Sequence, residues 1–200
     1  ARPGLKPALL EQVRFELAQD YVKAGVMDRA EALLQELAAQ GTHVAAALEL
    51  LRTTYEQGRE WRQAIDATRR LESVKGESRR KIIAHYWCEL VEEARAAQQP
   101  AEALKLALSA LAEDKSGVRA NLLLGGLYET AKNFTEAIKA YRRALDQDGR
   151  FLATVIEPLR RCYETLADKQ SYLDFLMDAK QQSSSSLPWL SEVQLLRSEG

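Results

Sequence analysis

The amino-acid sequence repeats with a period of 34 residues, and this periodicity constrains the fold more than any other feature. In the clearest unit, residues 118–151, a fixed pattern of large and small residues occupies unit positions 7, 8, 11, 20, 24 and 27: Leu124, Gly125, Tyr128, Ala137, Tyr141 and Ala144. Small residues let two helices approach closely, and large residues fill the space around that contact. A period of this length predicts an array of stacked helix pairs.

The pattern is that of the tetratricopeptide repeat, without its tryptophan at position 4 and its proline at position 32. Followed along the chain, it predicts four regular units and one divergent unit, at residues 11–44, 45–78, 84–117, 118–151 and 153–186. We interpret residues 1–10 as a lead-in, residues 79–83 as additional helix that breaks the phase, and residues 187–200 as the first helix of a truncated further unit. The expected fold is all-α: a right-handed superhelical solenoid of antiparallel helix pairs.

Turn and capping residues indicate where the helices end. Turn residues fall midway through the units, at Gly25, Gly58, Pro100 and Asn133. Asp28 and Asn133 each precede a glutamate by three residues, the spacing of a capping box, in which the first side chain accepts a hydrogen bond from an unpaired backbone N–H. We expect one helix to begin near Glu77, and we expect Pro158 to kink the first helix of the divergent unit.

Composition and charge exclude several classes of partner. Lys and Arg total 28 against 29 Asp and Glu, which gives a net charge of −1 and no global bias towards nucleic acid or anionic lipid. The basic clusters are interspersed with acids, so we expect no nucleic-acid partner. No apolar run is long enough to span a membrane and the chain begins without a secretory signal, which predicts a soluble, cytosolic chain. Cys88 and Cys162 are 74 positions apart and favour a reducing compartment over a disulfide framework.

The string IAHYWCEL, residues 83–90, raises three alternatives: a metal site, a cysteine nucleophile, or ordinary packing. His85 and Cys88 are three apart and share a helix face, but two ligands do not complete a zinc site. Catalysis by Cys88 needs a depressed pKa and an orienting partner, whereas a cysteine commonly behaves as a small buried hydrophobe. We therefore expect no metal, no cofactor and no enzymatic activity in this stretch of protein.

The repeat register offers a better interpretation of His85 and Cys88. In tetratricopeptide arrays, positions 2, 5, 9 and 12 of the first helix in each unit line the concave groove where partners lie. Each of these side chains has two alternative roles: it lines the groove, or it contacts a neighbouring helix. The register predicts a mixed, mildly acidic groove made of Phe15, Gln19, Glu49, Thr53, Glu56, His85, Cys88, Glu92, Arg95, Arg119, Leu122, Glu129 and Arg161.

Five strings are more specific than the repeat consensus: QDYVKAGVMDRAE, EWRQAIDATRRL, IAHYWCELVEEA, EDKSGVRANLLLGGLY and RRCYETL. In this order and spacing they closely resemble the tetratricopeptide core of the lipopolysaccharide assembly protein B family of Gram-negative bacteria. The resemblance covers roughly Gln12 to Leu195. The repeat positions alone identify a fold, whereas these strings indicate a family.

The resemblance implies a non-enzymatic adaptor. Members of the family are anchored in the inner membrane by one amino-terminal helix, carry their repeats in the cytoplasm and end in a rubredoxin-like four-cysteine metal domain. They help the membrane ATP-dependent protease FtsH degrade the deacetylase that commits precursor to lipid A, and an inner-membrane regulator that senses lipopolysaccharide opposes them. The partners that the resemblance implies are therefore the protease, the deacetylase and the regulator, at the cytoplasmic side of the inner membrane. The anchor and the four-cysteine domain have no counterpart in this sequence, so we expect neither here.

Two alternatives from other classes remain open. A generic tetratricopeptide chaperone or envelope-complex assembly scaffold would share the repeats, and would be preferred if the protein captured a different envelope protein. An enzyme would be preferred if the purified protein turned over a substrate and Cys88→Ala abolished that turnover without affecting folding.

Overall fold

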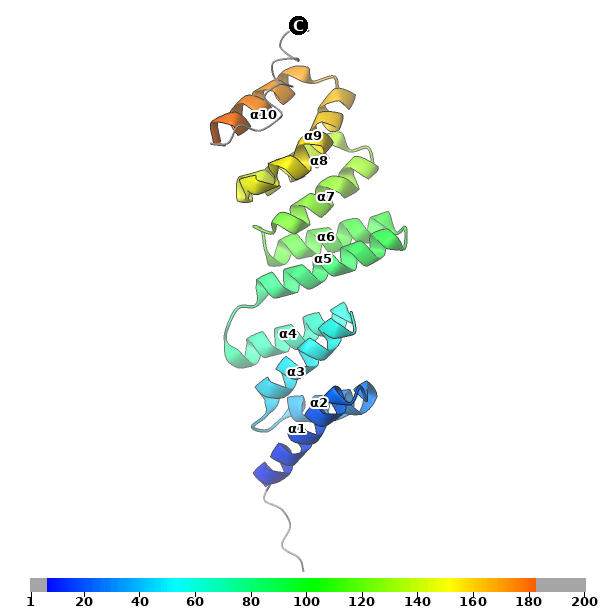
Figure 1. The fold of residues 1–200 in the computed structure, drawn as a ribbon, viewed down its shortest axis with the longest axis vertical. Helices are drawn as coiled ribbons and strands as arrows, with labels where there is room; N and C mark the ends of the chain where they lie inside the picture. Colours follow the sequence, from blue (N-terminus) through cyan, green and yellow to red (C-terminus); the bar gives the residue numbers. More distant parts are fainter. Residues whose placement is uncertain (1–6, 183–200) are drawn as a thin grey trace, which may run out of the picture. The chain divides into compact units, whose positions relative to one another are not determined.

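A computed structural model of the protein describes residues 7–182, and these residues form helices joined by short turns (Figure 1). The contacts divide the chain into two compact units, residues 1–90 and residues 91–200. The boundary falls within helix α5 (Arg80–Ala96), so the first half of α5 belongs to the first unit and the second half to the second unit. The predicted helix at residues 187–200 and the first six residues of the lead-in lie outside the described residues.

The first unit contains helix pairs that pack as the sequence predicts. Its helices before α5 are α1 (Pro7–Lys23), α2 (Met27–Ala39), α3 (Val44–Gln57) and α4 (Trp61–Lys75). Helix α1 packs on α2 and α3 packs on α4, while α2 also contacts α3. Short turns between packed neighbours make each pair an antiparallel hairpin. The interior is mostly apolar and includes Leu34, Leu48, Leu51 and Leu71, each at most 1% exposed.

The second unit repeats this arrangement. Besides the end of α5 it contains α6 (Pro100–Glu113), α7 (Val118–Thr130), α8 (Phe134–Gln147), the 3-10 turn η1 (Gly149–Phe151), α9 (Leu152–Thr165) and α10 (Lys169–Gln182). Helices α7 and α8 pack on each other, and α8 continues the packing onto α9. A cluster of buried side chains that includes Tyr141, Leu159 and Phe175 joins α8, α9 and α10. The predicted all-α array of helix pairs is confirmed over the described residues.

The first helix of every pair ends in the same way. One residue just after the helix has a left-handed backbone, and the next N–H bonds back to a carbonyl five residues earlier, which is the Schellman motif. The intervals between the left-handed residues are 34, 39, 34 and 35, so the period persists apart from five extra residues between the second and third of them and one between the last two. Only one of these residues is glycine; the set is Gly25, Arg59, Gln98, Lys132 and Ala167. The exact unit boundaries stay a prediction.

Individual helix boundaries confirm one prediction and correct two others. Asn133 caps α8 as expected, because its side chain accepts from the backbone N–H of Glu136 at 3.4 Å. Asp28 does not cap α2: the helix begins at Met27, so Asp28 lies inside the first turn, where a carboxylate still favours the helix dipole. Helix α5 begins at Arg80 rather than near Glu77, because left-handed Gly76 ends α4 and residues 76–79 form the connection.

Helix α9 continues without interruption through Pro158, where we expected an irregularity. The irregular element lies before α9 instead, at η1, where the Asp148 side chain accepts from the backbone N–H of Arg150. None of the described helices combines the length and the apolar character that crossing a membrane requires.

Candidate protein-binding surface

The predicted groove residues lie on the first helix of each pair: α1, α3 and α5 in the first unit, and α5, α7 and α9 in the second. Twelve of the thirteen keep part of their side chain accessible, and His85, Arg95 and Arg161 are exposed. The surface is therefore available for contact along each unit, as a groove assignment requires. Which of these residues touch a partner stays a prediction.

Cys88 is the exception, because it is 3% exposed and lies in the interior of the first unit. It cannot present its thiol to a partner or a substrate as the groove assignment required. The register put Cys88 at a groove position, but a small apolar side chain at that position is covered by its neighbours. Its behaviour is that of a small buried hydrophobe.

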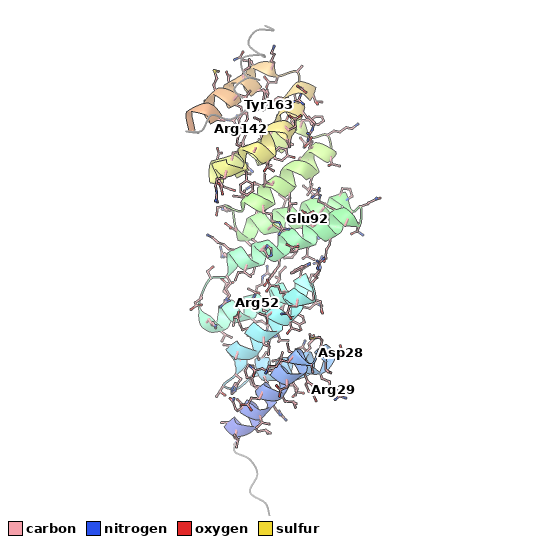
Figure 2. All side chains as sticks on the ribbon, viewed as in Figure 1. Asp28, Arg29, Arg52, Glu92, Arg142 and Tyr163 are labelled. Carbon is pink, nitrogen blue, oxygen red and sulfur yellow. The ribbon has the colours of Figure 1, made fainter. Side chains whose placement is uncertain are left out.

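A cluster centred on Arg52 dominates the groove positions of the first unit (Figure 2). The Arg52 guanidinium bridges two predicted groove residues, Glu49 at 2.7 Å and Glu56 at 2.9 Å, and donates to the Tyr86 hydroxyl on α5 at 3.0 Å. Burial disfavours the charge of Arg52, but the bonds to Tyr86 and Glu49 outweigh it and raise the pKa of Arg52. Arg79 lies 3.5 Å from Glu49, so the cluster joins α3, the connection after α4, and α5.

A second cluster lies in the second unit and joins two predicted groove residues directly. Glu129 on α7 accepts from the Arg161 side chain on α9 at 2.9 Å, and its other oxygen accepts from the Tyr141 hydroxyl on α8 at 3.0 Å. Burial, with the Glu129 charge beside it, raises the pKa of Tyr141. Glu129 thus ties α7 to both following helices, while Arg161 is half exposed.

The central arginine of α3 has a counterpart in α9 that we did not predict from sequence. Arg160 bridges Glu157 and Glu164 as Arg52 bridges Glu49 and Glu56. The two strings ELLRTTYE and EPLRRCYE share the pattern E-x-L-R-x-x-Y-E, which would have revealed the correspondence. We overlooked it because this repeat position normally holds a small packing residue, as Gly125 does in α7.

The remaining predicted residues form simpler contacts. Glu92 and Arg95 pair with each other on α5 at 2.8 Å. Phe15 on α1 packs against the ring of His43, with 5.3 Å between ring centroids. His85 lies 3.7 Å from Glu89. These contacts leave the side chains partly exposed and so compatible with partner binding.

The donor set does not fit the four-cysteine metal site of the resembled family. The two cysteines, Cys88 and Cys162, are buried, form no disulfide, and lie in different units. Burial raises the pKa of the Cys162 thiol to about 11, whereas a metal-ligating thiol has to ionise. Among the residues that the structure describes, no three His, Cys, Asp or Glu side chains converge as a metal site.

A cleft of about 320 Å³ between α2 and α4 was not anticipated. Its floor includes Leu51 and Tyr55 of α3, and polar side chains of α2 and α4 form its walls. The Tyr55 hydroxyl donates to Glu31 at 2.7 Å and accepts from Gln35 at 3.1 Å. Burial, together with the Glu31 charge, raises the pKa of Tyr55 to about 12. No sequence pattern indicated this cleft, because its walls come from separate repeats.

Over the described residues the fold defines the class of this molecule: it is an all-α array of repeated helix pairs, the architecture that tetratricopeptide repeats form. A family model described as Tetratricopeptide repeat matches residues 88–150. The chain is 28% identical over 171 residues to lipopolysaccharide assembly protein B of Escherichia coli K12, a match that covers 86% of this chain and 44% of that protein. The protein of the same name from Haemophilus influenzae is 29% identical over 168 residues, which covers 83% of this chain and 42% of that protein.

The resemblance seen in the sequence strings is therefore confirmed: curated homologues of this chain are lipopolysaccharide assembly B proteins. The chain spans less than half the length of these relatives. Among solved structures, it is similar to MamA with a TM-score of 0.49 and 16% sequence identity, over 88% of this chain and 97% of that one.

Proposed function

We propose that this protein is a non-enzymatic adaptor in the regulation of lipopolysaccharide synthesis, which presents the lipid A pathway deacetylase to the membrane protease FtsH for degradation. The observation that carries the proposal is the homology to lipopolysaccharide assembly protein B across 86% of the chain. It is supported by a repeat fold whose first helices keep their groove positions accessible. The proposed place of action is the cytoplasmic side of the inner membrane, where a lipopolysaccharide-sensing regulator would oppose it.

The chemistry of the exposed positions suits binding more than catalysis. They carry charged and amide side chains in pairs, such as Glu92 with Arg95, that a partner could displace or extend at small cost. The Cys88 thiol, which the sequence offered as a candidate nucleophile, is buried, and this supports binding over catalysis. A repeat array also provides an extended surface for holding a protein segment. Holding the deacetylase and the protease at once would raise the local concentration of one near the other.

Affinity capture with a membrane-anchored form of the protein tests this proposal. We expect the wild type to recover both the deacetylase and the protease. We expect Arg95→Glu to recover less of at least one of them, because the reversed charge at position 95 places a second acid beside Glu92 in the groove. The matched control is Lys139→Glu, which reverses the charge of an i,i+3 surface pair with Glu136 on α8, outside the predicted groove.

Three outcomes are decisive. Loss with Arg95→Glu and retention with Lys139→Glu supports groove binding. Equal recovery by both variants and the wild type contradicts the groove assignment while leaving the adaptor role standing. If the wild type recovers neither protein and captures a different envelope protein instead, the adaptor proposal is wrong and an assembly scaffold is the better description.

A further inference from the structure

The connection between helices α4 and α5 is basic, in contrast to the rest of the chain (Figure 1). Over residues 74–81 its sequence is VKGESRRK, with four Lys or Arg side chains and one acid, which gives a net charge of +3. The whole chain has a net charge of −1, so the remainder of the chain is negative. In the sequence between Glu72 and Glu89, Glu77 is the single acid. We name residues 74–81 the basic connection.

Two cations of the basic connection lie where a helix disfavours positive charge. Arg80 and Lys81 are exposed and occupy the first turn of α5, which contains no acid. The amino-terminal end of a helix carries a partial positive charge, so cations in the first turn destabilise the helix. Both residues also belong to residues 79–83, the predicted insertion that interrupts the repeat phase. The helix dipole and the repeat register therefore do not account for two adjacent cations at this place.

The other two cations of the basic connection contact glutamates of the first unit. Arg79 lies 3.5 Å from Glu49 and 3.8 Å from Glu77, and Lys75 lies 4.0 Å from Glu49. The same Glu49 carboxylate also accepts from Arg52, so three cations share it. The surface made by the basic connection and Arg52 stays net positive even when the glutamates that contact it are counted, namely Glu49, Glu56, Glu72 and Glu77.

An exposed apolar side chain lies within the basic connection. Val74, in the last turn of α4, is 51% exposed, which is more than any other large apolar side chain that the structure describes. Residues 73–78 are all exposed, so the turn that follows Val74 lies at the surface of the first unit. Cations around an exposed apolar side chain are typical of a peripheral membrane contact. There the apolar group enters the headgroup region and the cations meet the lipid phosphates.

We propose that the basic connection binds the surface of a bilayer that contains anionic phospholipid, with Arg80 and Lys81 at the lipid phosphates and Val74 at the headgroup boundary. A bilayer presents negative charge directly above an apolar layer, which matches cations beside an exposed valine. Nucleic acid and acidic peptides match the charge but offer no such layer. The contact goes beyond the proposed adaptor function, because it needs neither the deacetylase nor the protease.

Co-sedimentation of the purified protein with vesicles tests this inference. We expect binding to vesicles of phosphatidylglycerol and phosphatidylcholine in equal parts, and much weaker binding to vesicles of phosphatidylcholine alone. The double variant Arg80→Glu with Lys81→Glu is expected to bind the anionic vesicles less tightly by more than about tenfold, because each cation near an anionic surface strengthens binding about fivefold. Val74→Ser keeps every charge and is expected to weaken binding by a smaller factor.

The matched control is Lys139→Glu with Arg143→Glu, which changes the net charge by the same amount at exposed positions on α8 and is expected to bind like the wild type. Melting curves show that each variant is folded. We expect the Arg80→Glu, Lys81→Glu variant to melt no lower than the wild type, because acids suit the first turn of a helix. If it is not folded, Arg80→Gln with Lys81→Gln takes its place with the same expected loss of binding.

Several results would overturn the inference. One is a wild type that ignores anionic vesicles, and another is an equal loss of binding in the control, which would mean that net charge alone matters. Release by sodium phosphate well beyond release by sodium chloride at the same ionic strength would indicate a site for free phosphate instead. Binding to single-stranded RNA without binding to vesicles would indicate a nucleic-acid surface. Because the assay contains neither the deacetylase nor the protease, each of these results leaves the adaptor proposal standing.

Discussion

Single side chains decide how closely the helices of a pair can approach. At Gly125 the missing side chain admits the Tyr141 ring, whose hydroxyl then reaches Glu129 on the same helix as the glycine. One residue later, Gly126 has no such role. We therefore expect substitution by alanine to change the free energy of unfolding in opposite directions at the two positions, and each variant serves as the control for the other.

We predict that Gly125→Ala lowers the free energy of unfolding by about 1–3 kcal/mol, because the methyl group overlaps the Tyr141 ring and the core has to shift. Gly126→Ala is expected to raise the free energy of unfolding by about 0.5–1 kcal/mol through helix propensity alone. Urea denaturation followed by circular dichroism measures both. Equal effects of the same sign would show that α7 and α8 pack less closely than described.

The buried hydroxyl of Tyr55 affects how the stability of the fold changes at high pH. The pKa of Tyr55 is raised to about 12 from an ordinary 10.0, by burial first and by Glu31 second, so the folded state holds this proton more tightly than the unfolded state. The stabilisation is complete below pH 10 and is lost as the pH rises towards and beyond 12. We predict that Tyr55→Phe makes the fall of the melting temperature between pH 10 and 12 shallower.

Calorimetry across that pH range measures the effect against the wild type. Because phenylalanine cannot ionise, any remaining alkaline fall belongs to other groups, including Tyr86 and Tyr163, whose pKa values burial also raises. Identical slopes for the variant and the wild type would contradict the assignment to Tyr55.

At the scale of the element, helices α3 and α9 share a device that the other first helices lack. In each, an arginine replaces the small residue of the repeat consensus and is held between two glutamates of its own helix. In α3 the same arginine also bonds Tyr86 of α5, one period later. In α3 the arginine thus adds a polar contact to the next first helix, whereas the glutamates that Arg160 bridges lie on α9 itself.

We predict that Tyr86→Phe lowers the free energy of unfolding by about 1.5 kcal/mol, because it removes a hydrogen bond from a charged, part-buried guanidinium that keeps its two glutamates. Tyr128→Phe on α7 is the control, since its hydroxyl takes no part in these clusters. Thermal unfolding measures both. A cost for Tyr86→Phe no larger than that of the control would mean that the Arg52 cluster adds no stability.

At the scale of the whole molecule, stabilising contacts link neighbouring repeats. Arg52 with Tyr86 and Arg161 with Glu129 join residues 34 and 32 positions apart, and packed helices are consecutive or next but one in the chain. In such arrays, stability is close to a sum of repeat and nearest-neighbour contributions. A local defect should therefore stay local.

We predict that Gly125→Ala speeds amide hydrogen exchange in α7, α8 and α9 and leaves exchange in α1, α2 and α3 unchanged, because the disturbed contacts belong to the second unit. Hydrogen exchange followed by mass spectrometry at peptide resolution measures this. A uniform increase over both units would show that the chain opens as one cooperative body.

The sequence by itself was sufficient for the fold class and for the turns. Both follow from local signals that recur along the chain. Turn residues such as Gly25 and Gly58 and the Asn133 cap act within a few residues of themselves, and the 34-residue period repeats such signals. The family resemblance also rested on local strings, and homologues confirm it. Most predicted groove residues keep accessible side chains for the same reason, since helix periodicity determines the face on which each one lies.

Only the tertiary structure decided which side chains meet. Cys88 holds a groove position in the register, yet neighbouring side chains bury it. Arg52 holds a packing position, yet it has become the centre of a charged cluster because Tyr86 of another helix supplies an acceptor. Gly125 and Gly126 look alike in sequence and differ only because the Tyr141 ring covers one of them. Burial and pairing depend on groups from another helix, which for Arg52 and Tyr86 lie a full period apart, and the pattern along a single helix does not contain that information.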